Sequence, residues 1–168
     1  MPASEQDLSA LLDTLGIAHV THRHAPVFTV AESQELRGVL PGGHAKNLFL
    51  KDKKDRYLLA VVDEARRVDL KALGKAPGLA VDRLSFASAE RLAEVLGISP
   101  GSVTPFALIN ARGRRDLTVA LDAALMRHNP LNFHPLHNAA TTAIAADNLI
   151  AFIRHCGFAP IVLDFDAL

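Results

Sequence analysis

The chain has eight histidines, a side chain that can gain or lose a proton near neutral pH, and four of them form two close pairs. The pairs are His22-x-His24 and His134-x-x-His137, a kind of spacing found among zinc ligands. The one cysteine lies far away in the sequence, and neither pair belongs to a recognisable ligand set. We therefore expect no metal and no cofactor, and we interpret these histidines as surface or hydrogen-bonded groups.

Nucleophilic catalysis by the cysteine is also disfavoured. Cys156 falls at helical spacing among apolar residues, namely Leu149, Ile150, Phe152 and Ile153. This pattern predicts a thiol packed in the core of the protein. The sequence has neither a Gly-x-Ser-x-Gly nucleophile elbow nor a phosphate-binding Gly-rich loop. Common catalytic motifs thus give no assignment.

Three other features place polar groups in unusual settings. Lys46 stands at the head of a predicted strand and shares a face with Leu48 and Leu50, so it either extends to the rim or lines a cleft. The loop Gly101–Pro105 suits a binding site made of backbone amides, although a plain connector explains it too. His134, between Phe133 and Pro135, also suits a structural role.

The elements around these residues indicate an α/β protein. Helices are predicted after the caps Ser4, Thr29, Asp69, Ser88 and Asp147. Thr29 and Glu32 form a capping-box pattern, which explains both residues structurally. Strands or extended segments are predicted over 17–22, between the Pro-Gly-Gly turn at 41–43 and the turn at 51–56, and over 57–63, 83–88, 106–110, 117–122, 131–135 and 141–146. Residues 51–56 form a charged turn between two of these strands, which are therefore antiparallel.

Length and composition are those of an ordinary globular protein. The 168 residues suit one domain over 1–168, with a mixed, largely antiparallel central sheet flanked by helices. Lys and Arg number 18, as do Asp and Glu, so net charge indicates no nucleic-acid or membrane partner. The chain has no signal-peptide pattern and no apolar run long enough to span a membrane, so we expect a cytoplasmic protein.

Four ordered segments together resemble the YbaK/ProX family of aminoacyl-tRNA deacylases, which includes the editing domain inserted in bacterial prolyl-tRNA synthetases. The segments are PVFTVAE, LPGGHAKNLFLKDKK, RLSFASAERLAEVLGISPGSVTPFALIN and LNFHPLHNAATTAI. The resemblance runs from about His19 to Phe158 and is strongest to the free-standing branch called ProXp-ala or PrdX. It implies the fold of that editing domain.

The resemblance also implies roles for individual residues. Lys46 corresponds to the family's strand lysine, near the phosphate or ribose of the terminal adenosine, and Asn47 to a helper in the same region. Gly101 begins the Gly-x-x-x-Pro loop whose amides hold the ester carbonyl, and His134 belongs to the wall of the active site. These matches make Lys46, Gly101 and His134 the catalytic candidates. The substrate-binding candidates are Phe28, Thr29, Val30, Asn47, Ser102, Val103, Thr104, Pro105 and Asn132.

The function that the resemblance implies is hydrolysis of mischarged alanyl-tRNA(Pro) to alanine and free tRNA. The partner is then the alanine-bearing acceptor end of tRNA(Pro), with prolyl-tRNA synthetase or an elongation factor as a further partner. An activated ester needs only a positioned water and an oxyanion site, which fits a chain without a catalytic triad. Two alternatives stay open: a deacylase for cysteinyl- or another small aminoacyl-tRNA, and a non-catalytic module that binds tRNA or a synthetase.

Overall fold

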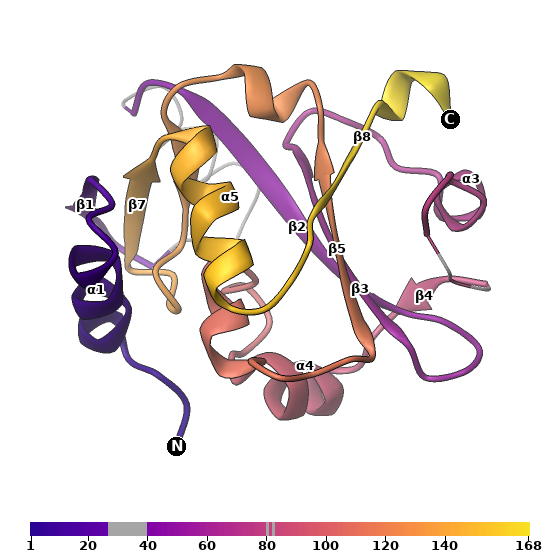
Figure 1. Cartoon of the computed structure of the whole chain (residues 1–168), viewed down its shortest axis with the longest axis horizontal. Coiled ribbons are helices and arrows are strands. Elements are labelled where there is room, and N and C mark those ends of the chain that lie inside the picture. Colours follow the sequence, from indigo (N-terminus) through magenta and orange to yellow (C-terminus); the bar gives the residue numbers. More distant parts are fainter. Residues whose placement is uncertain (27–39, 80, 82) are drawn as a thin grey trace.

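The computed structural model describes residues 1–26, 40–79, 81 and 83–168. In this part of the chain eight strands form one mixed sheet with helices on both faces (Figure 1). The strands are β1 (His19–Arg23), β2 (Gly43–Lys51), β3 (Tyr57–Asp63), β4 (Ser85–Phe86), β5 (Leu117–Asp122), β6 (Leu131–Phe133), β7 (Ala140–Ile144) and β8 (Ile161–Leu163). The α-helices are α1 (Glu5–Thr14), α3 (Leu70–Gly74), α4 (Ala89–Leu96) and α5 (Ala146–His155).

The strand order is β1-β7-β6-β2-β3-β5-β8, and β4 adds to β2. Four pairs are antiparallel, including the hairpin β2–β3 and the pair β6–β7. Three pairs are parallel: β2–β6, β3–β5 and β5–β8. This arrangement confirms the predicted α/β fold class with its mixed, mainly antiparallel sheet. In the part of the chain that the structure describes, no helix has both the length and the apolar run that crossing a membrane requires.

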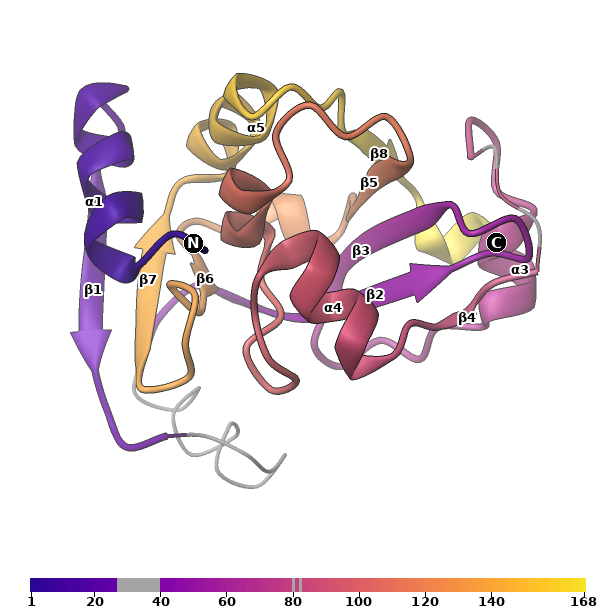
Figure 2. The ribbon, with the colours of Figure 1, turned by 90° about the horizontal axis from the view of Figure 1, so that it is seen from below.

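Both faces of the sheet are covered by apolar side chains. Successive residues of a strand point to opposite faces and therefore join different clusters. In β3, Leu59 and Val61 join the larger hydrophobic cluster, which also takes residues of α1, α4 and α5. Leu58 and Val62 join a smaller cluster with α3 and the end of the chain. Figure 2 shows α1 and β1 at one end of the sheet, and α3 and β4 at the other.

Several predicted helix caps are confirmed, since a cap depends on residues only two or three positions apart. The Ser4 side chain accepts a hydrogen bond from the Asp7 amide, and the Asp7 carboxylate accepts one from the Ser4 amide. Ser88 caps α4 through the Arg91 amide, and Asp69 caps α3. Gly97 ends α4 with φ of 64°, a left-handed conformation that costs glycine little.

Two local predictions are wrong. Residues 106–110 were expected to form a strand but belong to the 3₁₀ helix η1 (Pro105–Asn110), which Thr104 caps through the Phe106 amide. The cap residue of α5 is Ala145, without a side-chain hydrogen bond, and Asp147 lies inside the first turn. There its carboxylate still suits the positive end of the helix dipole. Strand β8 was not anticipated, because three residues are too short to show an alternation.

Candidate functional site

Strand β2 places Lys46 and Asn47 on opposite faces of the sheet. Lys46 lies opposite Val62 of β3, on the face where Leu48 packs against the smaller cluster. Asn47 lies opposite Val61, on the face of the larger cluster. The two side chains therefore leave the strand in different directions. Lys46 is half-buried and forms no ion pair with any described residue.

Asn47 connects β2 to the Gly101–Pro105 loop. Its Nδ2 donates a hydrogen bond of 3.1 Å to the carbonyl oxygen of Val103. Its Oδ1 is buried and accepts no hydrogen bond from any described residue. A buried acceptor without a donor costs about 1–3 kcal/mol, so such an atom calls for an explanation. A ligand that donates a hydrogen bond to Oδ1 would remove this cost.

The loop itself presents backbone rather than side chains. Gly101 has φ of 90°, which suits glycine, whereas Ser102, Thr104 and Pro105 are buried. The Ser102 amide donates to the Ser99 carbonyl at 3.1 Å and is therefore occupied. The amides of Gly101, Val103 and Thr104 donate to no described residue. The successive free amides expected here are thus interrupted at Ser102, and those on either side are the candidates for contact with an oxyanion.

His134 lies at the end of β6, at the start of the turn that leads into β7. Its Nδ1 is 3.2 Å from the carbonyl oxygen of Ala140, which can only accept, so this nitrogen carries the proton. Burial lowers the pKa of His134 below 6.5 despite that hydrogen bond. The lowered pKa favours the uncharged ring, which has a lone pair on Nε2 because Nδ1 carries the proton. The ring of His24 lies 6.5 Å away, between centroids.

The turn that carries His134 contacts the loop that carries Gly101. A Cβ placed on Gly101 would lie 3.9 Å from the Nδ2 atom of Asn138. Strand β2, the Gly101–Pro105 loop and the turn 134–139 therefore meet in one region. Asn138 was not singled out in the sequence, where the only signal is its place one residue after the His134-x-x-His137 pair.

Asn132 has a different environment from Asn47. It is buried, and its Nδ2 donates to the carbonyl oxygens of Pro41 and Gly43, each at 3.0 Å. These contacts attach β6 to the beginning of β2, where the two strands pair in parallel. Both hydrogen bonds of the Asn132 Nδ2 group thus have a structural role, and the expected contact of Asn132 with a substrate remains a prediction.

The N-terminal helix braces the turn from outside. His137 accepts a hydrogen bond from the Ala139 amide at Nδ1, so its Nε2 donates to Glu5 Oε1, 2.6 Å away. The Glu5 carboxylate also accepts hydrogen bonds from both terminal nitrogens of Arg23 in β1. The hydrogen bond from Arg23 is the main reason why the pKa of Glu5 is lowered. One carboxylate of α1 thus joins β1 to the turn that carries His134.

Three of the expected substrate-binding residues, Phe28, Thr29 and Val30, lie outside the described residues, as does the expected capping box.

Among the residues described, no three His, Cys, Asp or Glu side chains come close enough to share a metal ion. His24 has both ring nitrogens engaged, with the Ala25 carbonyl and the Thr141 hydroxyl. Cys156 is buried, and burial raises the pKa of its thiol to about 11. It is therefore not a nucleophile at neutral pH.

Comparison with known proteins connects this geometry to a family. Residues 24–152 match the family model described as the aminoacyl-tRNA editing domain. A Bos taurus protein named prolyl-tRNA synthetase associated domain-containing protein 1 is 38% identical over 167 residues, covering 98% of this chain and 94% of its own length. The prolyl-tRNA editing protein ProX of Acetoanaerobium sticklandii is 32% identical over 155 residues, covering 92% of this chain and 93% of its own length.

Solved structures support the same fold. One is a candidate trans-editing enzyme for prolyl-tRNA synthetase, which superposes with a TM-score of 0.69. The alignment covers 98% of this chain and 97% of that one, at 20% identity. At this identity the likeness shows the fold alone. The matched residues 24–152 include the whole region where β2, the Gly101–Pro105 loop and the turn 134–139 meet.

Proposed function

Because the chain belongs to the aminoacyl-tRNA editing domain family, we propose that it hydrolyses the ester bond of a mischarged aminoacyl-tRNA, and that its substrate is alanyl-tRNA(Pro). The products are alanine and free tRNA(Pro). Prolyl-tRNA synthetase and an elongation factor are the candidates for a protein that delivers the substrate. We place the reaction in the cytoplasm, where aminoacyl-tRNA is made and used.

The observation that carries this proposal is the junction between β2 and the Gly101–Pro105 loop. Asn47 holds the Val103 carbonyl at 3.1 Å, which fixes the loop against the sheet. The same side chain keeps a buried, unpartnered Oδ1 beside that loop. A substrate hydroxyl or ammonium group is a suitable donor for this oxygen. The arrangement therefore combines an acceptor for the substrate with backbone donors for its carbonyl oxygen.

The chemistry requires little from ionised side chains. Water adds to the ester carbonyl, the carbonyl oxygen becomes negative, and collapse of this intermediate releases the ribose hydroxyl and the amino acid. Amides of Gly101, Val103 and Thr104 are proposed to stabilise the oxyanion. The neutral His134 is proposed to accept a hydrogen bond at Nε2 from the water or a ribose hydroxyl. The family resemblance implies that the free ribose hydroxyl takes part, which reduces the need for a protein base.

Selectivity for alanine is the finer part of the proposal. A synthetase site made for proline rejects a smaller side chain weakly, since each missing methylene is worth about 1–3 kcal/mol. A second site that is too small for proline would correct the error. Phe28 and Val30 are the candidates for the walls of that site, and they lie outside the described residues.

A panel of charged tRNAs tests both levels of the proposal. Single-turnover rates are measured on alanyl-, cysteinyl-, seryl- and prolyl-tRNA(Pro), each corrected for hydrolysis without protein. We expect alanyl-tRNA(Pro) to be cleaved and prolyl-tRNA(Pro) to be spared, because a pocket that fits a methyl group is overpacked by a pyrrolidine ring at about 1–3 kcal/mol or more. Equal rates on the alanyl and prolyl esters would contradict the editing assignment. Faster cleavage of the cysteinyl ester would favour the other small-residue deacylase.

Absence of hydrolysis on all four substrates would favour a non-catalytic role. That alternative rests on the names of relatives such as the Bos taurus protein, which describe an associated domain and no reaction.

Treatment with EDTA tests whether the hydrolysis proceeds without a metal ion. Treatment with EDTA is expected to leave the rate unchanged, since no set of three ligands is present among the described residues. Loss of activity that zinc restores would contradict this expectation.

A further inference from the structure

Charge is distributed unevenly along the sheet, although the net charge is zero. We call the region around α3, the β2–β3 turn and the segment before β5 the basic end. Among the described residues it holds nine Lys and Arg but four Asp and Glu, namely Asp52, Asp55, Asp69 and Asp116. Its bases are Lys51, Lys53, Lys54, Arg56, Lys71, Lys75, Arg83, Arg114 and Arg115.

Most of the acidic groups at the basic end are occupied by other contacts. Asp52 is buried and accepts from the Arg56 side chain at 2.7 Å, and Asp116 binds Arg114 at 2.9 Å. Asp69 caps α3 through two backbone amides. Six bases remain exposed and form no ion pair with a described residue: Lys53, Lys54, Lys71, Lys75, Arg83 and Arg115.

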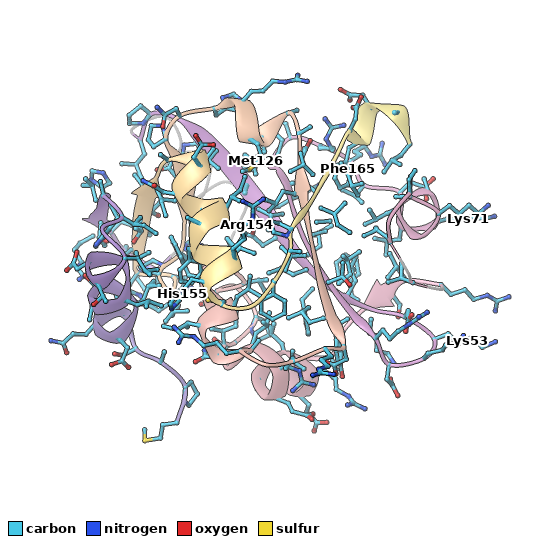
Figure 3. The ribbon with its side chains drawn as sticks, in the orientation of Figure 1. Lys53, Lys71, Met126, Arg154, His155 and Phe165 are labelled. Carbon is cyan, nitrogen blue, oxygen red and sulfur yellow. The ribbon has the colours of Figure 1, made fainter. Side chains whose placement is uncertain are left out.

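Four of these cations, Lys71, Lys75, Arg83 and Arg115, line two neighbouring hollows. The larger, of about 550 Å³, is bounded by α3 with Lys71 and Lys75 and by Arg83. The smaller, of about 380 Å³, is bounded by Arg56 and Arg115. Val81 borders both, so the hollows adjoin and form one shallow cationic groove. Figure 3 shows Lys71 and Lys53 extending from this same end of the molecule.

At the opposite end of the sheet acidic groups outnumber Lys and Arg, since Arg23 is the one such base in α1 and β1 and it pairs with Glu5. Helix α1 contains Glu5, Asp7 and Asp13 and no Lys or Arg. Figure 2 shows α1 and α3 at the two ends of the sheet. A polyanion whose tip lies at Asn47 is therefore repelled on one side and attracted on the other. Strand β2 leads from Asn47 to Lys51 at the basic end, a distance of about 13 Å at the usual rise per residue.

We propose that the basic end binds the phosphate backbone of the double-stranded stem that adjoins the aminoacylated 3′ end of the tRNA. The inference rests on the proposed function for the identity of the RNA. Duplex RNA is bound mainly through its phosphates and 2′-hydroxyls, because its major groove is too deep and narrow for side chains. Flexible, exposed lysines and arginines along a shallow groove suit that backbone. The contact supplies affinity and direction, whereas the reaction takes place about four residues further along β2.

The experiment compares two double variants that remove the same charge. Lys71→Gln/Lys75→Gln changes the basic end, and Arg127→Gln/Arg154→Gln changes two exposed arginines, one in η2 (Leu125–Arg127) and one in α5. Figure 3 shows Arg154 on α5. The probe is an uncharged RNA hairpin with an acceptor-stem sequence and an unpaired 3′ CCA end. Its dissociation constant is measured by fluorescence anisotropy from about 50 to 200 mM salt. Melting temperatures show that both variants are folded.

We expect the Lys71/Lys75 variant to bind the hairpin about tenfold or more weakly. Its slope of log affinity against log salt should be smaller by about 2, since each lost phosphate contact removes about 1. The arginine variant should bind like the wild type. Equal affinity and slope in all three proteins, or equal loss in both variants, would overturn the proposal. So would failure of the wild type to bind the hairpin.

Hydrolysis separates this proposal from the proposed function. With aminoacylated hairpin at saturating protein, the Lys71/Lys75 variant should react at the wild-type rate, because the basic end does not contact the ester. If the wild type hydrolyses no ester but the variant alone loses hairpin binding, the basic end stands as an RNA surface and the enzymatic proposal fails. If the wild type hydrolyses the ester and the variant matches it in affinity, only the basic end is overturned.

Discussion

The two ends of β2 have contrasting chemistry. On the face of β2 where Asn47 lies, the groups are uncharged and largely buried: a side-chain amide, backbone amides and a histidine whose pKa is lowered by burial. Around Lys51 the groups are exposed cations at the surface. Fixed dipoles in an enclosed site stabilise a charge that forms during a reaction, since they need little reorganisation. Mobile surface cations attract a charge that is already present, with little demand on geometry. The contrast predicts that changes at the two ends alter different kinetic quantities.

Lys46 gives the strongest test of this contrast, because it is a cation that lies one residue from Asn47. Lys46→Ala is expected to lower the single-turnover rate by roughly ten- to a hundredfold, since loss of a charge-assisted contact costs about 1.5–3 kcal/mol. Lys54→Ala, at the basic end, is the matched control and should change affinity only. A wild-type rate in Lys46→Ala would show that Lys46 does not act in the reaction and only extends to the rim of the site.

Asn47 and Asn132, two asparagines of the sheet, provide the next comparison. Asn47→Ala is expected to reduce the rate by roughly tenfold, because it frees the Val103 carbonyl and removes the acceptor Oδ1. Asn132→Ala should instead lower the free energy of unfolding by about 1–3 kcal/mol, since two carbonyls lose their donor. Rate measurements and urea unfolding of both variants distinguish the roles. An Asn132→Ala protein that is stable but inactive would move Asn132 into the site.

The sequence predicted local structure best where the signals are close together. The predicted caps at Ser4 and Ser88 are confirmed, because each cap depends on a backbone amide only three residues away. The apolar stretch 106–110 was read as a strand, since a short apolar run has no period that separates strand from helix. Thr104 followed by Pro105 was the missed signal, as both suit the start of a helix.

The candidate site could be predicted only in part. Family motifs identified Asn47, the Gly101–Pro105 loop and His134, and the structure brings these segments together through Val103 and Asn138. The opposite directions of Lys46 and Asn47 follow from strand alternation. The pairing of Glu5 with His137 spans 132 positions, and nothing in local sequence specifies such a contact. The expected roles of Lys46, Gly101 and His134 remain predictions.

The pH dependence of His134 is expected to give a smaller effect. Protonation removes the Nε2 lone pair, so the rate should decline as pH falls through the lowered pKa of His134, after subtraction of hydrolysis without protein. Stability should change in the same direction. The pKa is lower in the folded state, so the unfolded state binds more protons, and stability present above pH 6.5 is lost as pH falls through the folded pKa. His134→Gln should remove both dependences; a wild-type pH profile in this variant would exclude His134 as their source.

Cys156 should give the smallest effect on activity. With a thiol pKa of about 11, it is expected to resist alkylation by iodoacetamide at pH 7. Cys156→Ala should keep the wild-type rate and lower the free energy of unfolding by about 1 kcal/mol, through a small cavity beside α5. Rapid alkylation of the folded protein, with loss of activity, would contradict the enclosed position of this residue.

The contacts of the first five residues bear on where a functional unit can be cut. The family match begins at residue 24. Yet the Ala3 amide donates to Asn110 at the end of η1 (2.7 Å), and Glu5 holds the turn 134–139 through His137. A truncation placed at the boundary of the family match would therefore remove a contact to η1, which follows the Gly101–Pro105 loop, and a contact to the turn 134–139. A purification tag is likewise better attached after Leu168 than before Met1, because Ala3 and Glu5 make contacts that hold η1 and the turn 134–139 in position.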